Sequence, residues 1–170
     1  MTESGYLVSR SGVAVYVRAM GLANMANAPV LEAFLNEELT FGVQVICVDL
    51  SECIGMDSTF MGTLVAFHHR LQSQDGRFMV VNPSDGNRRL LDMLGVSTVL
   101  PVLGDHSVPD LEFIRLQNNG PMSPIERAHL MKRAHEALMD LSDANRDKFT
   151  PFLAALEADL QRRQGDAESS

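Results

Sequence analysis

The residues of this chain that could support covalent catalysis are one serine and its acidic and basic neighbours. Ser58 directly follows Asp57, and His68 and His69 come later in the same helix-forming stretch. A histidine activates a serine only within hydrogen-bonding reach. His68 lies ten residues of helix beyond Ser58, which is on the order of 15 Å. The Gly-x-Ser-x-Gly turn of hydrolases is also absent. We therefore expect no catalytic residue, and we expect both histidines on a helix surface.

The sequence also lacks a complete motif for binding a metal or a phosphate group. Glu126-x-x-His129 matches half of the helix motif of di-iron proteins, but a second Glu-x-x-His helix is absent. His135 follows His129 by six residues, which places the two rings on different faces of a helix. Because a metal site needs several convergent ligands, we expect these histidines to belong to a solvated polar face. A glycine-rich phosphate loop is absent too, so we expect neither a metal nor a cofactor.

Composition and charge narrow the class of protein. The 170 residues suffice for one domain with an appendage, and 45% of them are hydrophobic, which supports a packed core. The net charge of −8, from 14 basic and 22 acidic residues, disfavours nucleic acid and anionic lipid as partners. No apolar run is long enough to cross a membrane, and residues 1–10 lack the layout of a signal peptide.

Cysteine usage bears on the compartment. Cys47 and Cys53 are the only cysteines, and they do not form a Cys-x-x-Cys pair. Both lie in or beside an apolar run, which indicates reduced core residues, with a disulfide between them as the less favoured alternative. We therefore expect a cytoplasmic protein.

Hydrophobic periodicity predicts alternating strands and helices as far as Leu103. Strands are expected at 6–9, 13–17, 43–50, 78–81 and 96–103, with the first two forming a hairpin and Gly21 ending the second. Helices with apolar residues at three- and four-residue spacing are expected at 28–41, 60–71 and 84–94. Because this alternation requires crossover connections, we expect an α/β fold with a mixed, mostly parallel sheet and helices packed on it.

The composition changes after Leu103, where a C-terminal helical extension is expected. Residues 104–122 are rich in proline, glycine and asparagine and indicate a linker, with at most one short element at 111–116. Two helical apolar stripes follow, and Thr150-Pro151 is expected to start or kink the second helix. The chain thus divides into a domain (1–103), a linker (104–122), a helical extension (123–164) and a polar tail (165–170). We expect the stripes to pack within the chain, with a homodimer interface as the alternative.

The most informative stretch runs from the end of the strand at 43–50 into the following helix. It contains Asp49-Leu50-Ser51 and then Met56-Asp57-Ser58-Thr59-Phe60-Met61-Gly62. In open α/β sheets, ligands and partners bind at the carboxyl ends of the strands. A serine there lies beside the unpaired amides of a helix N-terminus. We therefore expect Ser58 to be exposed, and Asp57, Ser58 and Thr59 are the candidates to cap the helix.

This stretch resembles the signature of STAS domains, the family of anti-sigma-factor antagonists. The family pattern is Asp-Leu-Ser, a spacer, Asp-Ser-Ser or Asp-Ser-Thr, and a glycine in the first helical turn. It is met by Asp49, Leu50, Ser51, Asp57, Ser58, Thr59 and Gly62, and later by Gly76, Arg89-Leu90-Leu91 and Leu94-Gly95. Two positions depart from it. Asn24 stands where the family usually has an acid, and Phe60 replaces a small residue beside the serine.

The resemblance implies a non-catalytic domain that binds proteins. In the simplest members, a kinase that is also an anti-sigma factor phosphorylates the serine that aligns with Ser58, and a phosphatase reverses this. We therefore expect a phosphorylation-controlled partner switch with Ser58 as the phosphosite and Thr59 as the less favoured acceptor. The expected partner surface comprises Asn24, Asp57, Ser58, Thr59, Phe60 and Met61.

Two alternatives to the switch remain open. The first is a constitutive scaffold or transporter-associated subunit in which Ser58 is never modified. The second is a sensor that binds a small ligand near the same strand end.

Overall fold

A six-stranded mixed sheet organises the computed structural model, which describes residues 3–118 and 120–169. The strands are β1 (Gly5–Ser11), β2 (Ala14–Ala23), β3 (Val45–Met56), β4 (Arg77–Val81), β5 (Val102–Leu103) and β6 (Ile114–Arg115). Their order is β5-β4-β3-β2-β1-β6. Strands β2 to β5 run parallel, whereas β1 is antiparallel to both β2 and β6. The prediction of a mixed, mostly parallel sheet is confirmed.

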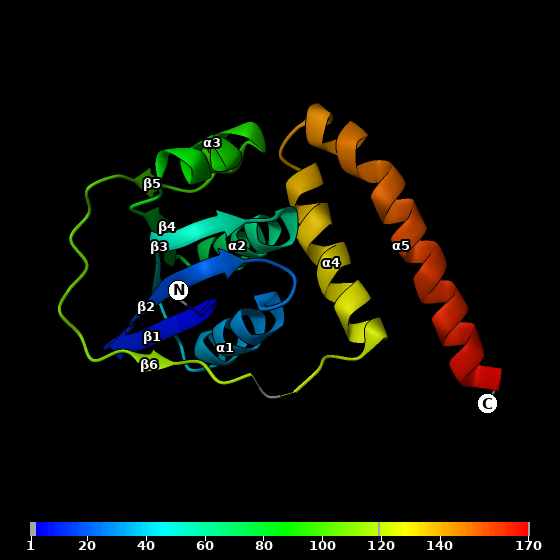
Figure 1. Ribbon diagram of the computed structural model, residues 1–170, viewed down its shortest axis with the longest axis horizontal. Coiled ribbons are helices and arrows are strands. Elements are labelled where there is room, and N and C mark those ends of the chain that lie inside the picture. The colour runs from blue at the N-terminus through cyan, green and yellow to red at the C-terminus, as the bar shows by residue number, and fades with distance from the viewer. Residues whose placement is uncertain (1–2, 119, 170) are drawn as a thin grey trace.

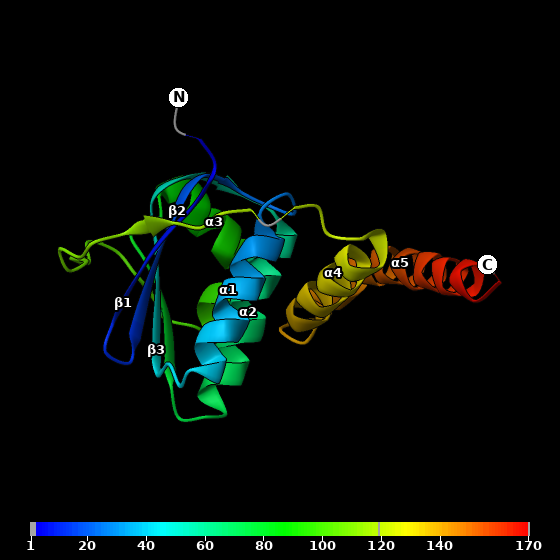
Figure 2. The same cartoon turned by 90° about the horizontal axis from the view of Figure 1, so that it is seen from below.

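The helices α1 (Ala28–Thr40) and α2 (Ser58–Gln72) lie side by side on one face of this sheet (Figure 2). Helix α3 (Asp85–Met93) and the short 3-10 helix η1 (Val96–Thr98) follow β4. The predicted apolar stripes form the core together with alternate strand residues; this core includes Leu31, Leu35, Leu64, Phe67, Leu71, Val15, Val17, Ile46 and Val48. Burial of these stripes against the sheet therefore fixes α2, and with it Ser58, at the carboxyl end of β3.

Two further helices form an antiparallel hairpin beside the domain (Figure 1). They are α4 (Pro124–Met139), which begins with a capping box between Ser123 and Glu126, and α5 (Asp143–Ser169). Leu138 and Phe149 belong to the same hydrophobic core as the sheet. The expectation that the extension packs within the chain is therefore confirmed.

Several element boundaries differ from the sequence predictions. Gly21 does not end β2, because a register shift against β3 accommodates its φ of 68° and the strand continues to Ala23. Residues 96–103 are not one strand, since η1 occupies their start and only Val102–Leu103 pairs with β4. Pro151 does not start the last helix but lies inside α5, on its exposed side. Residues 165–169 of the predicted polar tail continue α5.

The predicted linker is partly ordered by the sheet. Its one short element is β6, which pairs with β1 within the expected range 111–116. The chain therefore crosses from β5 at one edge of the sheet to β6 at the other before it reaches α4. Residues 1, 2, 119 and 170, which fall in the predicted domain, linker and tail, lie outside the described residues.

Candidate functional site

Ser58 is the first residue of α2, and Asp57 is its N-cap. The Asp57 carboxylate accepts one hydrogen bond from the Phe60 amide and one from the Met25 amide, both at 2.9 Å. Of the three expected candidates, Asp57 therefore caps the helix and Ser58 does not, and Ser58 is half-buried where it was expected to be exposed. Because a carboxylate satisfies the orphan amide, the hydroxyl of the half-buried Ser58 is free for another contact.

That contact is with a histidine of the C-terminal extension. Ser58 Oγ lies 2.9 Å from His135 Nε2, and His135 Nδ1 lies 2.7 Å from the Met131 carbonyl oxygen. Since a carbonyl only accepts, the proton of the neutral ring is on Nδ1, and Nε2 accepts the hydrogen bond from Ser58. This pair could not be predicted from the sequence, because the two residues are 77 positions apart.

His135 is enclosed by aromatic rings of α5. Only 3% of the residue is exposed. Its ring centroid lies 5.0 Å from that of Phe149 and 4.6 Å from that of Phe152. Burial lowers the pKa of His135, although the Met131 carbonyl and the negative charge of Asp57 act in the opposite direction. The expectation that His135 belongs to a solvated polar face is therefore wrong, and the ring is neutral at physiological pH.

The close approach of α4 to α2 depends on Gly62. A Cβ placed on Gly62 would lie 2.1 Å from the Ala134 carbonyl oxygen and 2.8 Å from the Ala134 Cα. No side chain fits in that space, so glycine in the first turns of α2 allows the backbones of the two helices to touch. In this chain, therefore, the glycine of the sequence motif faces a helix that lies outside the domain.

Three residues of the expected partner surface are buried. The Phe60 ring is completely buried and stacks on Tyr6 with 6.3 Å between ring centroids. Thr59 and Met61 are also buried, at 4% and 3% exposure. Phe60 therefore fills the core beneath α2, which corrects the expectation that it lines a surface. The helical spacing of Phe60 with Leu64, Phe67 and Leu71 already indicated this inward position, whereas the surface assignment came from the family motif.

Asn24 lies close to this site but has a local structural role. Its side-chain oxygen accepts a hydrogen bond from the Ala26 amide at 2.9 Å, and its carbonyl oxygen accepts one from the Ala28 amide at 2.8 Å. These bonds shape the turn that leads from β2 into α1. The structure thus brings Asn24 into the loop beside Asp57, whose carboxylate binds Met25 of the same turn.

A small cavity adjoins Ser58. It has a volume of about 190 Å³, and its lining combines Asp57 and Ser58 with Met93 of α3 and Lys148 and Phe149 of α5. The remaining lining residues are all apolar: Met56, Met61, Leu90 and Leu94. The domain and the extension therefore meet around Ser58.

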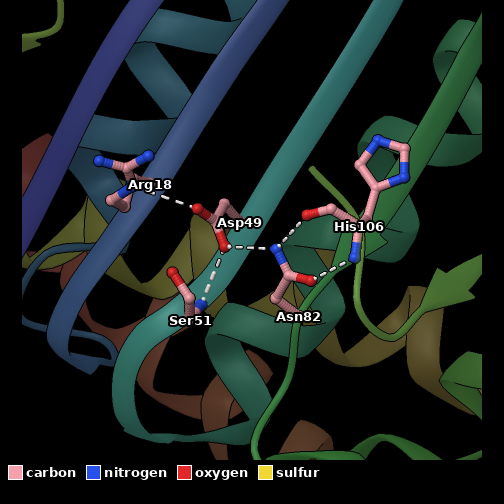
Figure 3. Close-up of polar contacts among 5 residues, drawn as sticks. All are labelled: Arg18, Asp49, Ser51, Asn82 and His106. Atoms are coloured by element: carbon pink, nitrogen blue, oxygen red, sulfur yellow. Dashed lines mark hydrogen bonds and ion pairs between the residues drawn. The ribbon is translucent and has the colours of Figure 1, made fainter. Parts of the chain in front are cut away.

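Asp49, in the first half of the STAS-like motif, has a different role from Ser58. Its carboxylate lies on the face of the sheet opposite to α1 and α2. As Figure 3 shows, the Asp49 carboxylate forms an ion pair with Arg18 at 3.1 Å and accepts hydrogen bonds from the Ser51 amide at 3.0 Å and the Asn82 side chain at 3.3 Å. The Asn82 amide group in turn exchanges two hydrogen bonds with the backbone of His106. Asp49 therefore links β2 and β3 to the loop at 104–113 and does not contribute to the Ser58 site.

The structure also places the other residues that were considered for catalysis or metal binding. His68 is buried at 8% exposure, which corrects its expected surface position, and its Nδ1 has no hydrogen-bond partner. Residues 3–118 and 120–169 contain no cluster of three or more potential metal ligands. Ser58 and His135 form a serine–histidine pair, but the second nitrogen of the ring donates to a neutral carbonyl, where a catalytic triad has a carboxylate. Cys47 and Cys53 are buried free thiols.

A family model described as "Mlab, STAS domain" matches residues 6–103. The chain belongs to the STAS domain family. Helices α4 and α5 lie outside the matched region of this STAS domain. No functionally curated protein matches the sequence.

Solved structures share the fold at low sequence identity. The Thermotoga maritima protein tm1081 is 21% identical, with a TM-score of 0.54 over 58% of this chain and 85% of that chain. The anti-sigma factor antagonist SpoIIAA in its unphosphorylated form is 19% identical, with a TM-score of 0.52 over 60% and 89%. An anti-sigma factor antagonist from Mycobacterium paratuberculosis is 23% identical, with a TM-score of 0.53 over 61% and 86%. These similarities establish the fold of the domain.

The described helices include none with the length and apolar character needed to cross a membrane.

Proposed function

We propose that this STAS domain is a non-catalytic protein-binding switch, in which phosphorylation of Ser58 changes the affinity for a partner protein. The observation that carries the proposal is the position of the Ser58 hydroxyl. It stands at the start of α2, in the serine position of the family motif, while Asp57 and not Ser58 caps the helix. Modification of Ser58 therefore leaves the N-cap of α2 intact.

The chemistry of phosphate at this position supports a change in affinity. An ATP-dependent serine kinase would transfer the γ-phosphoryl group of ATP to Ser58 Oγ, with loss of the hydroxyl proton and release of ADP. The product carries about −1.5 to −2 charges near neutral pH. The amides at the start of α2 favour that charge within the domain. A partner face that is acidic or closely packed on Ser58 would bind the modified form more weakly.

Relatives with the same fold support the partner class. Two of the similar structures are anti-sigma factor antagonists, one of them described in its unphosphorylated form. We infer a partner that is both an anti-sigma factor and a serine kinase, together with a phosphatase that restores the hydroxyl. The net charge of −8 disfavours nucleic acid as a direct partner. Buried free thiols at Cys47 and Cys53 support action in the reducing cytoplasm.

A small-ligand sensor is less well supported at this site. The cavity beside Ser58 measures about 190 Å³, whereas pockets for small ligands usually measure roughly 300–1,000 Å³. Its wall is mostly apolar and includes side chains from both α3 and α5. A protein surface explains this position better than a ligand pocket does.

The proposal is tested by phosphopeptide mass spectrometry of the native protein under several growth conditions. Phosphate is expected on Ser58 and not on Thr59, because Thr59 is only 4% exposed. Absence of phosphate on Ser58 under every condition, combined with equal partner affinity for Ser58→Ala and Ser58→Asp, would leave the constitutive scaffold or transporter-associated subunit as the explanation.

A further inference from the structure

We propose that the α4–α5 hairpin is an internal ligand of the Ser58 surface, so that the hairpin and a protein partner compete for the unmodified surface and a phosphate on Ser58 opposes the docking of either one, releasing the hairpin and weakening the partner. This inference rests on the proposed function and names the regulation of the same site. The occupant is a segment of this chain, residues 124–169, that lies outside the region shared with the family.

The docked hairpin covers the residues that a partner or kinase would have to reach. His135 accepts the hydrogen bond of the Ser58 hydroxyl at 2.9 Å. Ala134 touches Gly62 through its backbone, one helical turn further along α2. Phe149 joins the domain core and lines the cavity beside Ser58. A kinase needs the Ser58 hydroxyl in its own active site, which it cannot reach while α4 lies on it.

The two helices of the hairpin are held together by contacts of their own, so they can separate from the domain as one unit. Ala128, Leu156 and Leu160 form a hydrophobic cluster of their own between α4 and α5, separate from the domain core. Lys132 and Glu157 form an ion pair across the same two helices at 3.6 Å. The connecting segment between β6 and α4 has no regular secondary structure over its described residues. A released hairpin would therefore keep its internal contacts and stay attached to the sheet.

The hairpin contacts the domain along α2 and through the shared hydrophobic core, and a partner would have to replace these contacts. Besides the packing of Leu138 and Phe149, Arg133 pairs with Glu32 of α1 at 2.6 Å, and the Asn145 side chain donates to the Leu94 carbonyl at 2.8 Å. Most of α5 beyond Phe149 is exposed, apart from Leu156 and Leu160 in the hairpin's own cluster. A partner that covers the start of α2 could offset this loss.

Phosphate is incompatible with the docked contact for two reasons. A phosphorylated Ser58 Oγ carries no proton, so it faces His135 Nε2 as a second acceptor. The distance of 2.9 Å is that of a direct hydrogen bond and leaves no room for a phosphoryl group on that line. The phosphate would also stand beside the Asp57 carboxylate. Lys148, which lines the adjacent cavity, supplies one opposing positive charge.

The test is hydrogen–deuterium exchange of the full chain, with the amides of α4 as the readout. Phosphoserine is placed at position 58 during translation, so that no kinase needs to be known. Gly62→Ala is the opening variant, because its Cβ would strike the Ala134 carbonyl oxygen. Gly86→Ala in α3 is the matched control, because the nearest atom to its Cβ is Ser84 Oγ at 4.0 Å.

We expect α4 to exchange at least about tenfold faster in both the phosphoserine form and Gly62→Ala, with β3 and β4 still protected and Gly86→Ala unchanged. If Gly62→Ala fails to fold, Arg133→Glu replaces it; repulsion from Glu32 should then raise the exchange of α4 several-fold. Unchanged or slower exchange of α4 in the phosphoserine chain would overturn the inference. That result would not bear on whether Ser58 is phosphorylated in native cells. Conversely, a lack of native phosphorylation would not alter the exchange result, so the two proposals can fail separately.

Discussion

At the residue scale, the site depends on the hydrogen bond between the Ser58 hydroxyl and the His135 ring. The Ser58 hydroxyl donates to His135 Nε2, whereas Asp57 performs the capping. We predict that Ser58→Ala and His135→Ala are coupled by about 0.5–1.5 kcal/mol of unfolding free energy in a double-mutant cycle measured with urea. Ser84→Ala, which removes the N-cap of α3, should cost the same with and without His135. Strictly additive effects of Ser58→Ala and His135→Ala would contradict the contact.

His135 also makes hairpin docking sensitive to pH. Burial lowers its pKa in the docked state, against the opposing effects of the Met131 carbonyl and Asp57. In the released hairpin the ring regains its ordinary pKa of about 6.5. Docking is therefore at full strength above about pH 6.5 and weakens as the pH falls below it, because the released form binds the proton more readily.

We predict that exchange of the α4 amides, corrected for the intrinsic pH dependence, accelerates below about pH 6.5 in the wild type and much less in His135→Gln. His68 has a pKa lowered by burial and by His69, so its contribution should persist in both proteins. An equal acceleration in His135→Gln would show that another group controls docking.

Sequence reasoning reached Ser58 but not its surroundings. The motif predicted that Ser58 stands at the start of a helix that follows a strand, and the structure has it there, because the order of strand, loop and helix is local. His135 was assigned to a polar face, since nothing in the spacing of Glu126, His129 and His135 indicates a partner 77 residues away. Phe60 was assigned to the surface, although its ring stacks on Tyr6 in the core. The error for His135 concerns a tertiary contact, which periodicity does not encode, whereas the helical spacing of Phe60 with Leu64 and Phe67 did indicate that Phe60 faces the core.

At the scale of elements, Asp49 joins the loop at 104–113 to the sheet and has no part in the switch. We predict that Asp49→Ala lowers the unfolding free energy by about 1–3 kcal/mol, because Arg18 and the Asn82 side chain lose a buried partner. Limited proteolysis within 104–113 should become faster, while exchange of α4 stays unchanged. Asp110→Ala, at an exposed position of the same loop, should alter neither. Faster exchange of α4 in Asp49→Ala would show that the two faces are coupled.

Elements with long apolar stripes were predicted well, and their ends were not. The stripes of α1 and α2 alone specify those helices, because each buries one face on the sheet. The strand expected at 96–103 failed because Gly95 adopts a φ of 74° and a helical turn follows it. The prediction that Pro151 starts the last helix failed because α5 begins eight residues earlier, at Asp143, and tolerates an exposed proline in its interior.

At the scale of the whole molecule, the hairpin contributes to the core of the domain. Leu138 and Phe149 pack on it, so deletion of residues 123–170 should expose apolar surface. We predict a lower melting temperature and increased aggregation, or separation of a dimer if the hairpin also joins two copies. Light scattering and thermal unfolding of the truncated chain provide the measurement. A truncated chain of equal stability and unchanged association state would show that the hairpin is dispensable.

The central claim is that the state of Ser58 sets the affinity for a protein partner. The most direct measurement is a binding titration of the partner captured from native cells against three full-length chains: wild type, Ser58→Ala and the phosphoserine form. Their melting temperatures are compared first, so that lost folding is not taken for lost binding. We predict that the alanine variant retains the partner and that the phosphoserine form binds at least about tenfold more weakly, a difference of about 1.4 kcal/mol. Equal affinity of the three chains would contradict the claim.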